Sequence, residues 1–110
     1  MARNYFVTGI TDLLVLSILK KQDSYAYEIS KTIQQQSQGL LSISHATIYP
    51  AIYKLENDGY ISEYSQTVGK RRVRVYYHLE KKGLDYLKDL LTAYQQVNQG
   101  VNSVLQFLDQ

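Results

Sequence analysis

The sequence of 110 residues predicts a mainly α-helical fold that contains a two-stranded β-hairpin and ends in a long C-terminal helix. Three observations support this fold class. Apolar residues recur with the helical period of 3.6 in three segments before residue 58. Between residues 60 and 79 the period changes to two, which is typical of strands. From residue 80 the apolar spacing becomes a heptad pattern.

The composition is that of an ordinary globular domain. Hydrophobic residues make up 45% and charged residues 20% of the chain, and the net charge is only +2. The overall charge therefore does not indicate nucleic-acid binding, and the distribution of charge must be considered instead. The absence of cysteine excludes disulfides and thiolate metal sites and fits a reducing, cytoplasmic location. The N-terminal apolar run is too short to cross a membrane and lacks a cleavage site.

The first two helices are expected over residues 10–20 and 25–37. Leucine and isoleucine side chains surround most of the first helix, which predicts a central position in the fold. Ser24 is the expected N-cap of the second helix, with Glu28 in its first turn. Gly39 is the expected stop after this helix.

A third helix is predicted within "SHATIYPAIYKLENDGYI", residues 44–61, with Ser44 as its N-cap. Ile48, Ile52 and Leu55 form its apolar stripe. Pro50 lies inside this helix, where proline removes a backbone donor, but the loss is tolerable in the early turns. The face opposite the stripe carries Tyr49, Pro50 and Tyr53, so we interpret it as an outward, functional face.

A hairpin is predicted from strands over residues 60–67 and 72–79, joined by a turn that contains Gly69. Val73, Val75, Tyr77 and Leu79 alternate with polar or aromatic residues, which predicts a half-buried second strand. The segment "GKRRVR" at the turn holds four of the twelve Lys and Arg residues of the chain. Cations clustered on a protruding turn suit phosphate contacts, although a basic turn is often only a solvated one.

One long helix is expected over residues 80–108, about 43 Å in length. Its apolar residues step alternately by three and four, as in the seam of a coiled coil, with a single Asn that can fix the register. This seam predicts a homodimer, and the alternative is that the helix covers the core of its own domain. The predicted interface residues are Tyr5, Phe6, Leu84, Leu87, Leu91, Tyr94, Asn98, Val101, Leu105 and Leu108. The domain boundary is accordingly placed between residues 1–79 and the C-terminal dimerisation helix, residues 80–110.

Three short helices followed by a hairpin form the layout of a winged helix-turn-helix. In this layout the third helix enters the major groove of DNA and the hairpin tip contacts the backbone. Ser44 and the first turn of the third helix would offer donors to a phosphate. The candidate DNA-binding residues are Ser44, His45, Thr47, Tyr49, Pro50, Tyr53, Lys54, Lys70, Arg71, Arg72 and Arg74.

The same segments resemble the PadR-like family of bacterial winged-helix transcriptional regulators over nearly the whole chain. "TDLLVLSILKKQDSYAYEI" is similar to the first-helix leucine run and the start of the second helix in that family. "SHATIYPAIYKLENDGYI" is similar to its recognition segment, and "RVYYHLEKKG" to the end of its wing. Two positions depart from the pattern: Ala26 stands where the family usually has Gly, and Glu80 where it usually has Thr.

The resemblance implies a homodimeric repressor whose C-terminal helix packs against the N-terminal helix of its partner. It implies DNA contacts at Ser44, Thr47, Tyr49, Pro50, Tyr53, Lys70, Arg71 and Arg72. The expected partner is double-stranded DNA carrying an inverted repeat, with half-sites about one helical turn apart. Having one C-terminal helix, the chain is similar to the short branch of the family, which includes multidrug-sensing regulators with tryptophan-lined pores. This sequence has no Trp, so the class of effector stays open, and a small hydrophobic or aromatic molecule is expected.

Two alternative functions fit the sequence less well. An enzyme is disfavoured because His45 and His78 lie far apart and neither is expected to have a nearby carboxylate or metal-ligand spacing, and because no nucleotide-binding or nucleophile motif occurs. No metal or cofactor is therefore expected. A winged-helix protein-interaction module without DNA binding would have a neutral wing and an altered recognition helix, unlike "GKRRVR" and "TIYP". Tyr25, Tyr27, Tyr60, Tyr64 and Tyr86 are expected at the edge of the core or in an interface.

Overall fold

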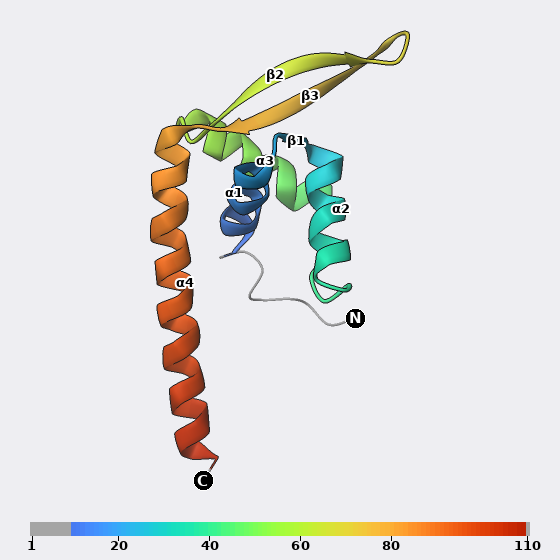
Figure 1. Cartoon of the computed structure of the whole chain (residues 1–110). Helices are drawn as coiled ribbons and strands as arrows, with labels where there is room; N and C mark the ends of the chain where they lie inside the picture. Colours follow the sequence, from blue (N-terminus) through green and yellow to red (C-terminus); the bar gives the residue numbers. More distant parts are fainter. Residues whose placement is uncertain (1–9, 110) are drawn as a thin grey trace.

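The structure, a computed structural model, describes residues 10–109. Within this range the elements follow the order α1 (Thr11–Lys21), β1 (Ser24–Tyr25), α2 (Ala26–Gln36), α3 (His45–Asn57), β2 (Ile61–Val68), β3 (Arg72–Leu79) and α4 (Lys81–Leu108). Helices α1, α2 and α3 pack together on one side of the β2–β3 hairpin, and α4 leaves the hairpin base and runs along α1 (Figure 1). The molecule is elongated, with extents of 62 × 34 × 20 Å. No helix in this described range is long and apolar enough to cross a membrane.

The hydrophobic core lies where the first three helices meet. Leu16 of α1, Ile29 of α2 and Ile48 of α3 are fully enclosed, with 0% of each side chain exposed. Burial of one such side chain stabilises the fold by about 1.5–3 kcal/mol. Ile52 and Leu55 continue the buried stripe of α3. The apolar stripe predicted for residues 44–61 is thus confirmed, and its burial fixes which side of α3 faces outward.

The sheet has three strands, one more than the sequence predicted. Ser24 and Tyr25 form the short strand β1, which pairs antiparallel with β3 through Ser24↔Tyr77 and Tyr25↔Tyr76. The prediction of Ser24 as an N-cap was wrong, because α2 begins at Ala26 with Tyr25 in the cap position. The buried Ser24 hydroxyl instead donates to the Gln22 carbonyl oxygen at 3.2 Å.

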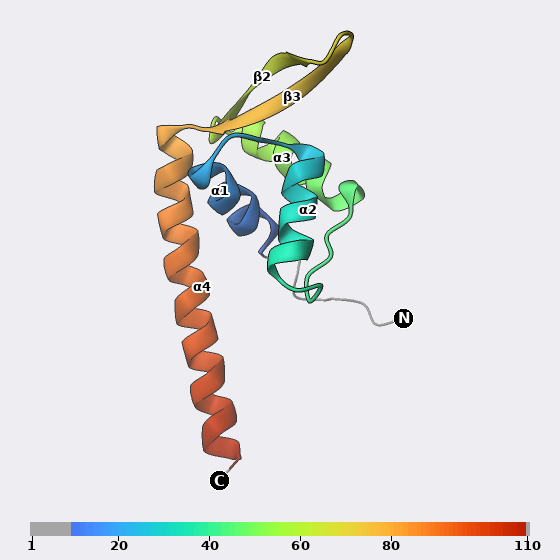
Figure 2. The ribbon, with the colours of Figure 1, turned by 45° about the vertical axis from the view of Figure 1, so that its right-hand side comes forward.

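The β2–β3 hairpin is regular but only its inner end is buried. Its pairing runs from Ile61↔Leu79 to Val68↔Arg72, and the connecting turn starts at Gly69, whose φ of +70° favours glycine. Tyr77 is 7% exposed, whereas Val73 is 61% exposed. The expectation of a half-buried second strand was therefore wrong for its outer half. The outer half of the hairpin rises away from the helices, and no other element of residues 10–109 covers it (Figure 2).

Helix α4 has the predicted length, but its two halves differ. Leu87 is 4% exposed and belongs to the core of the helical domain, so this predicted interface residue packs within its own chain. Leu84 is half-buried, while every residue of α4 from 91 to 108 is exposed. In both views this distal half projects alone beyond the other helices (Figures 1 and 2). Tyr5 and Phe6 lie outside the described residues.

The junction between the end of α3 and the start of α4 is closely packed. The rings of Tyr60 and Tyr86 stack at 4.4 Å between centroids, and Lys82 Nζ donates to the Asp58 carbonyl oxygen at 2.7 Å. A Cβ on Gly83 would collide with the Tyr60 carbonyl oxygen. Gly83 is thus required by a close backbone approach.

Glu80, the position where the chain departs from the family pattern, belongs to the same junction. It occupies the N-cap position of α4 without a side-chain capping bond. Its carboxylate instead accepts a hydrogen bond from Ser62 Oγ at 2.5 Å. The side chain therefore ties the start of α4 to the inner end of β2.

Candidate nucleic-acid interface

The outer face of α3 carries side chains that the core does not use. Tyr49 and Tyr53 are 52% and 67% exposed, and Pro50 between them is also exposed. Ser44 is the N-cap residue, as predicted, and its carbonyl oxygen accepts hydrogen bonds from the Thr47 and Ile48 N–H groups at 3.0 and 2.9 Å. The helix passes Pro50 without interruption, so this face is continuous from its first turn to its third.

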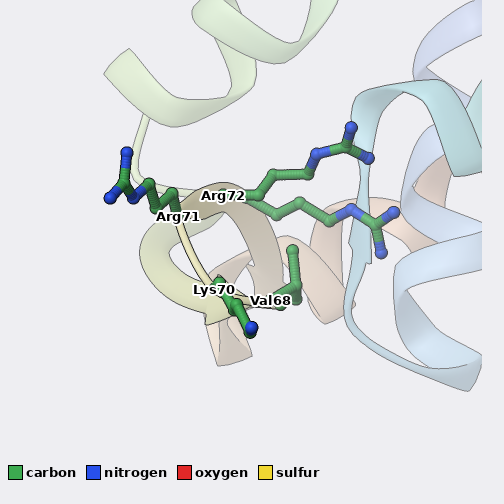
Figure 3. Close-up of a pocket in the computed structure, with 6 residues that line it drawn as sticks. Val68, Lys70, Arg71 and Arg72 are labelled. Atoms are coloured by element: carbon green, nitrogen blue, oxygen red, sulfur yellow. The ribbon is translucent and has the colours of Figure 1, made fainter.

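The tip of the hairpin, which we call the wing tip, is strongly cationic. Val68, Gly69, Lys70, Arg71, Arg72 and Arg74 surround an open hollow of about 570 Å³. The side chains of Lys70, Arg71 and Arg72 spread from the turn in different directions (Figure 3). No salt bridge within residues 10–109 involves these three cations. Their charge is consequently available to an external anion such as a phosphate.

Two predicted DNA-binding cations have contacts inside the chain. The Arg74 guanidinium lies over the Tyr25 ring, 4.4 Å from its centroid, and the residue is half-buried. Lys54 lies near Asp12: burial raises the pKa of the Asp12 carboxyl, and the positive charge of Lys54 opposes this rise. Arg74 is thus partly covered by its own chain, whereas Lys54 remains exposed like the three cations at the turn but has an acidic side chain nearby.

A chain of aromatic rings, which we call the aromatic ladder, connects α3 to the hairpin across α2 and β1. Its members are Tyr49, His45, Tyr27, Tyr25, Tyr76 and Tyr64, and successive ring centroids lie 5.7, 6.1, 6.5, 5.5 and 5.7 Å apart. Tyr27 is 56% exposed, so it lies on the surface and not at the edge of the core, the first of the two places expected for it. The pair of tyrosines in "SYAYE" is the sequence feature that could have indicated this run of stacked rings. Tyr60 and Tyr86, by contrast, pack against the core, which confirms that expectation.

His78 has a carboxylate partner that was not visible in the sequence. Its Nδ1 lies 2.9 Å from Asp23 Oδ1, and the Tyr64 hydroxyl donates to Asp23 Oδ2 at 2.8 Å. The hydrogen bond to Asp23 raises the pKa of His78, against a smaller opposing effect of burial. Burial also raises the pKa of Asp23, but the hydrogen bonds from His78 and Tyr64 outweigh it and leave the pKa below its ordinary value.

The Asp23 bridge ties the segment before β1 to both strands of the hairpin. The prediction that neither histidine has a nearby carboxylate was thus wrong for His78, since β1 pairing brings these distant residues together. In the part of the chain that the structure describes, no three His, Asp or Glu side chains cluster in the manner of metal ligands.

Three helices, a hairpin with a cationic tip and an exposed third helix together define a winged-helix protein of the class that regulates transcription. The family model of the "Transcriptional regulator PadR-like family" matches residues 15–89, and the chain belongs to this family. The resemblance found in the sequence is thereby confirmed.

Solved structures support the same assignment. A transcriptional regulator from Clostridium thermocellum is 33% identical, with 91% of this chain and 97% of that chain covered and a TM-score of 0.84. The negative transcriptional regulator PadR of Bacillus subtilis is 26% identical over 79% of this chain and 48% of its own length. A crystal structure of the Bacillus subtilis PadR in complex with operator DNA matches with a TM-score of 0.69 and 26% identity, covering 74% of this chain and 46% of that chain. This chain thus spans about half the length of that relative.

Proposed function

We propose that the protein is a homodimeric repressor that binds an inverted-repeat operator in double-stranded DNA and is released by a small molecule. The observation that carries the DNA-binding part is the charge of the wing tip. Lys70, Arg71 and Arg72 are exposed and unpaired by any acidic side chain in the described range. A solvated turn would not need this density of cations, whereas phosphate contacts do. The operator complex of the Bacillus subtilis PadR supports the same partner.

The outer face of α3 supplies the second half of the proposed interface. In a winged helix the third helix enters the major groove, so Tyr49, Pro50 and Tyr53 would approach the bases while Ser44 and Thr47 approach a phosphate. The alternative, a winged-helix interaction module without DNA binding, would not require both an open basic tip and an exposed polar-aromatic helix. We therefore favour DNA as the partner.

Dimerisation is supported by the distal half of α4. Leu91, Val101 and Leu105 are 41%, 50% and 58% exposed, and every residue of α4 from 91 to 108 is exposed within the described residues 10–109. Tyr94, Asn98 and Leu108 continue the same heptad seam. A helix with one long apolar face is stable in water only when that face is covered. A second copy of α4 has the matching pattern, which makes a two-fold dimer the natural solution.

An effector site is proposed beside this seam. Ile10 and Leu13 of the α1 region and Leu90, Ala93, Tyr94 and Val97 of α4 line an apolar cleft of about 310 Å³. This volume is at the lower end of the range for small-molecule pockets. A small hydrophobic or aromatic molecule bound there would alter how α4 packs. Regulation would then act through the dimer interface.

The test of DNA binding begins with selection of bound duplexes from a random pool. Arg71→Ala and Arg72→Ala are then compared with Lys88→Ala, which removes an exposed cation of α4 far from the wing. We expect each wing variant to weaken binding to all sequences alike and to reduce the slope of log K against log salt by about 0.9. Lys88→Ala should leave both unchanged. A changed base preference with an intact salt slope would contradict the phosphate assignment, and an absence of any bound duplex would contradict the function.

The selected duplex also provides the test of effector release. Small aromatic and aliphatic compounds are screened for dissociation of the native protein from this duplex, and active compounds are retested on Ala93→Leu, which fills the cleft. We expect the substitution to abolish release while DNA binding persists. Release that is unaffected by Ala93→Leu would place the effector elsewhere.

A further inference from the structure

We infer that the first turn of α2 is part of the DNA-binding surface, and that Tyr27 donates a hydrogen bond to a backbone phosphate. This inference rests on the proposed function and adds an element that neither the recognition helix nor the wing provides. Tyr27 is the second residue of α2 and is 56% exposed. Tyr27 is joined through His45 to the exposed Tyr49, and a contiguous exposed aromatic patch is typical of an interaction surface.

The position of Tyr27 is continuous with the outer face of α3. Its ring stacks on His45, the first residue of α3, with the ring planes within 15° of parallel. His45 in turn contacts Tyr49, one helical turn further along the face proposed to meet DNA. A duplex lying on Tyr49 would therefore extend over His45 to Tyr27.

The Tyr27 ring is held in place before any DNA arrives. Its second ring neighbour is Tyr25, with centroids 6.5 Å apart and planes 19° from parallel. Tyr25 is in turn met edge-on by Tyr76 of β3 and carries the Arg74 guanidinium above its ring. Stacked aromatic pairs of this kind stabilise each other beyond the burial of their surfaces. A side chain ordered in advance loses little conformational freedom on binding, which favours a contact made through it.

The free donor of Tyr27 distinguishes it from the other end of the aromatic ladder. The Tyr64 hydroxyl donates to Asp23 at 2.8 Å, whereas the Tyr27 hydroxyl has no hydrogen-bond partner among residues 10–109. Lys31, exposed one turn later on the same face of α2, adds positive charge beside it. A phenol donor next to a cation suits a phosphate oxygen, and tyrosine hydroxyls commonly make such backbone contacts.

The role is therefore one of affinity and placement on the backbone, not of base recognition. A neutral donor displaces no counterion, so its loss should leave the salt dependence of binding unchanged. An unchanged salt slope therefore distinguishes the loss of Tyr27 from the loss of a wing cation, which reduces the slope. It also distinguishes the loss of one phosphate hydrogen bond from a general loss of positive charge.

The experiment compares Tyr27→Phe with native protein by fluorescence anisotropy on two probes: a labelled mixed-sequence duplex of about 30 bp, three helical turns, and a duplex recovered from the random pool. Tyr27→Phe keeps the stack and removes only the hydroxyl. We expect binding to both duplexes to weaken by about three- to tenfold, the worth of one hydrogen bond, with the salt slope unchanged. Tyr86→Phe, which removes a hydroxyl from a stacked tyrosine at the α4 junction, is the control and should bind as native.

Each other outcome is decisive. Native affinity of Tyr27→Phe, together with weakened binding of Arg71→Ala, would remove α2 from the interface and leave the proposed function intact. A loss confined to the selected duplex would show a base contact and overturn the phosphate assignment. If the native protein binds neither duplex, the proposed function itself fails. Circular dichroism of each variant verifies that the helices are retained.

Discussion

The wing and the distal half of α4 both project from the same core, yet their surfaces are opposite in character. The outer hairpin ends in Lys70, Arg71 and Arg72, while α4 beyond residue 90 exposes leucine, valine and phenylalanine side chains. Within residues 10–109, no layer of the chain covers either the wing tip or α4 beyond residue 90. Cations in water lose little when left uncovered, whereas an apolar helix face gains from every contact that removes it from water. This difference in character supports the proposal of two different partners, an anion at the wing tip and a protein surface along α4.

The two projections share one attachment, and the largest effect is expected there. Gly83 lies against the Tyr60 backbone where the hairpin ends and α4 begins. Gly83→Ala places a methyl group against a carbonyl that cannot rotate away, so we expect the free energy of unfolding to fall by about 3 kcal/mol. Gly100→Ala, at a helical glycine with open space around it, should instead gain about 0.5–1 kcal/mol. Urea denaturation of both variants measures the contrast, and equal effects would refute the close approach.

The apolar projection is tested by a charge placed on its seam. Leu105 is 58% exposed in the single chain, and a two-fold dimer would bury it in both copies. We expect Leu105→Glu to raise the dimer dissociation constant by about 100-fold, because two leucine side chains lose their burial. Ser103→Glu, on the opposite side of α4, should not change it. Sedimentation at several concentrations distinguishes the variants, and a native protein that sediments as a monomer at micromolar concentration would contradict the assignment of this surface.

A smaller effect is expected at the base of the wing, and it depends on pH. The folded pKa of His78 is raised from 6.5, so its stabilising contribution is complete below pH 6.5 and is lost as the pH rises through the folded value. The folded pKa of Asp23 is lowered from 3.8, so its contribution is present above pH 3.8 and is lost as the pH falls through the folded value. The bridge is therefore strongest between these limits.

His78→Gln removes the titrating partner of this bridge. We expect it to cost less than about 1 kcal/mol, because the pair is partly exposed to solvent. The loss should be greater at pH 5.5 than at pH 8.5 in denaturation curves. A difference that is the same at both pH values would show that the ionic part of the bridge contributes nothing.

The smallest effect is expected at the outer wing. Val73 is 61% exposed whereas Val15 in α1 is 0% exposed. Val73→Thr should change the free energy of unfolding by less than about 0.5 kcal/mol, and Val15→Thr should lower it by about 1–3 kcal/mol, since its hydroxyl would be buried. A large loss at Val73 would mean that the wing is covered in the free protein.

Local patterns in the sequence were sufficient for the helices, the hairpin and the stripe of α3. Ile48, Ile52 and Leu55 follow the helical period, and their burial determined the outer face. The wing cations were also predictable, because clustered charge needs no knowledge of distant residues. The resemblance to the PadR-like family rested on these same local segments, and the family match covers them.

The features that were missed depend on pairing across long distances in the chain. Strand β1 exists only because Ser24 meets Tyr77 across the sheet, and the same pairing brings Asp23 to His78. The heptad spacing placed Leu87 in the seam, but periodicity cannot tell a helix face that covers its own domain from one that meets a partner. The close approach of Gly83 to the Tyr60 backbone is also a contact between separate segments, and no local pattern indicates it.

The junction of α3 and α4 has a mechanical consequence. Lys82 donates a hydrogen bond to the carbonyl oxygen of Asp58, just after α3, and Tyr86 of α4 stacks on Tyr60, so the end of α3 and the start of α4 are directly connected. Helix α4 has 28 residues, and α3 is attached near its first turn. In the proposed dimer, two copies of α4 would cross along their distal halves. A small change in their crossing angle would alter the distance between the two copies of α3. The spacing between half-sites on DNA would thus be set at the far end of the molecule from the bases themselves.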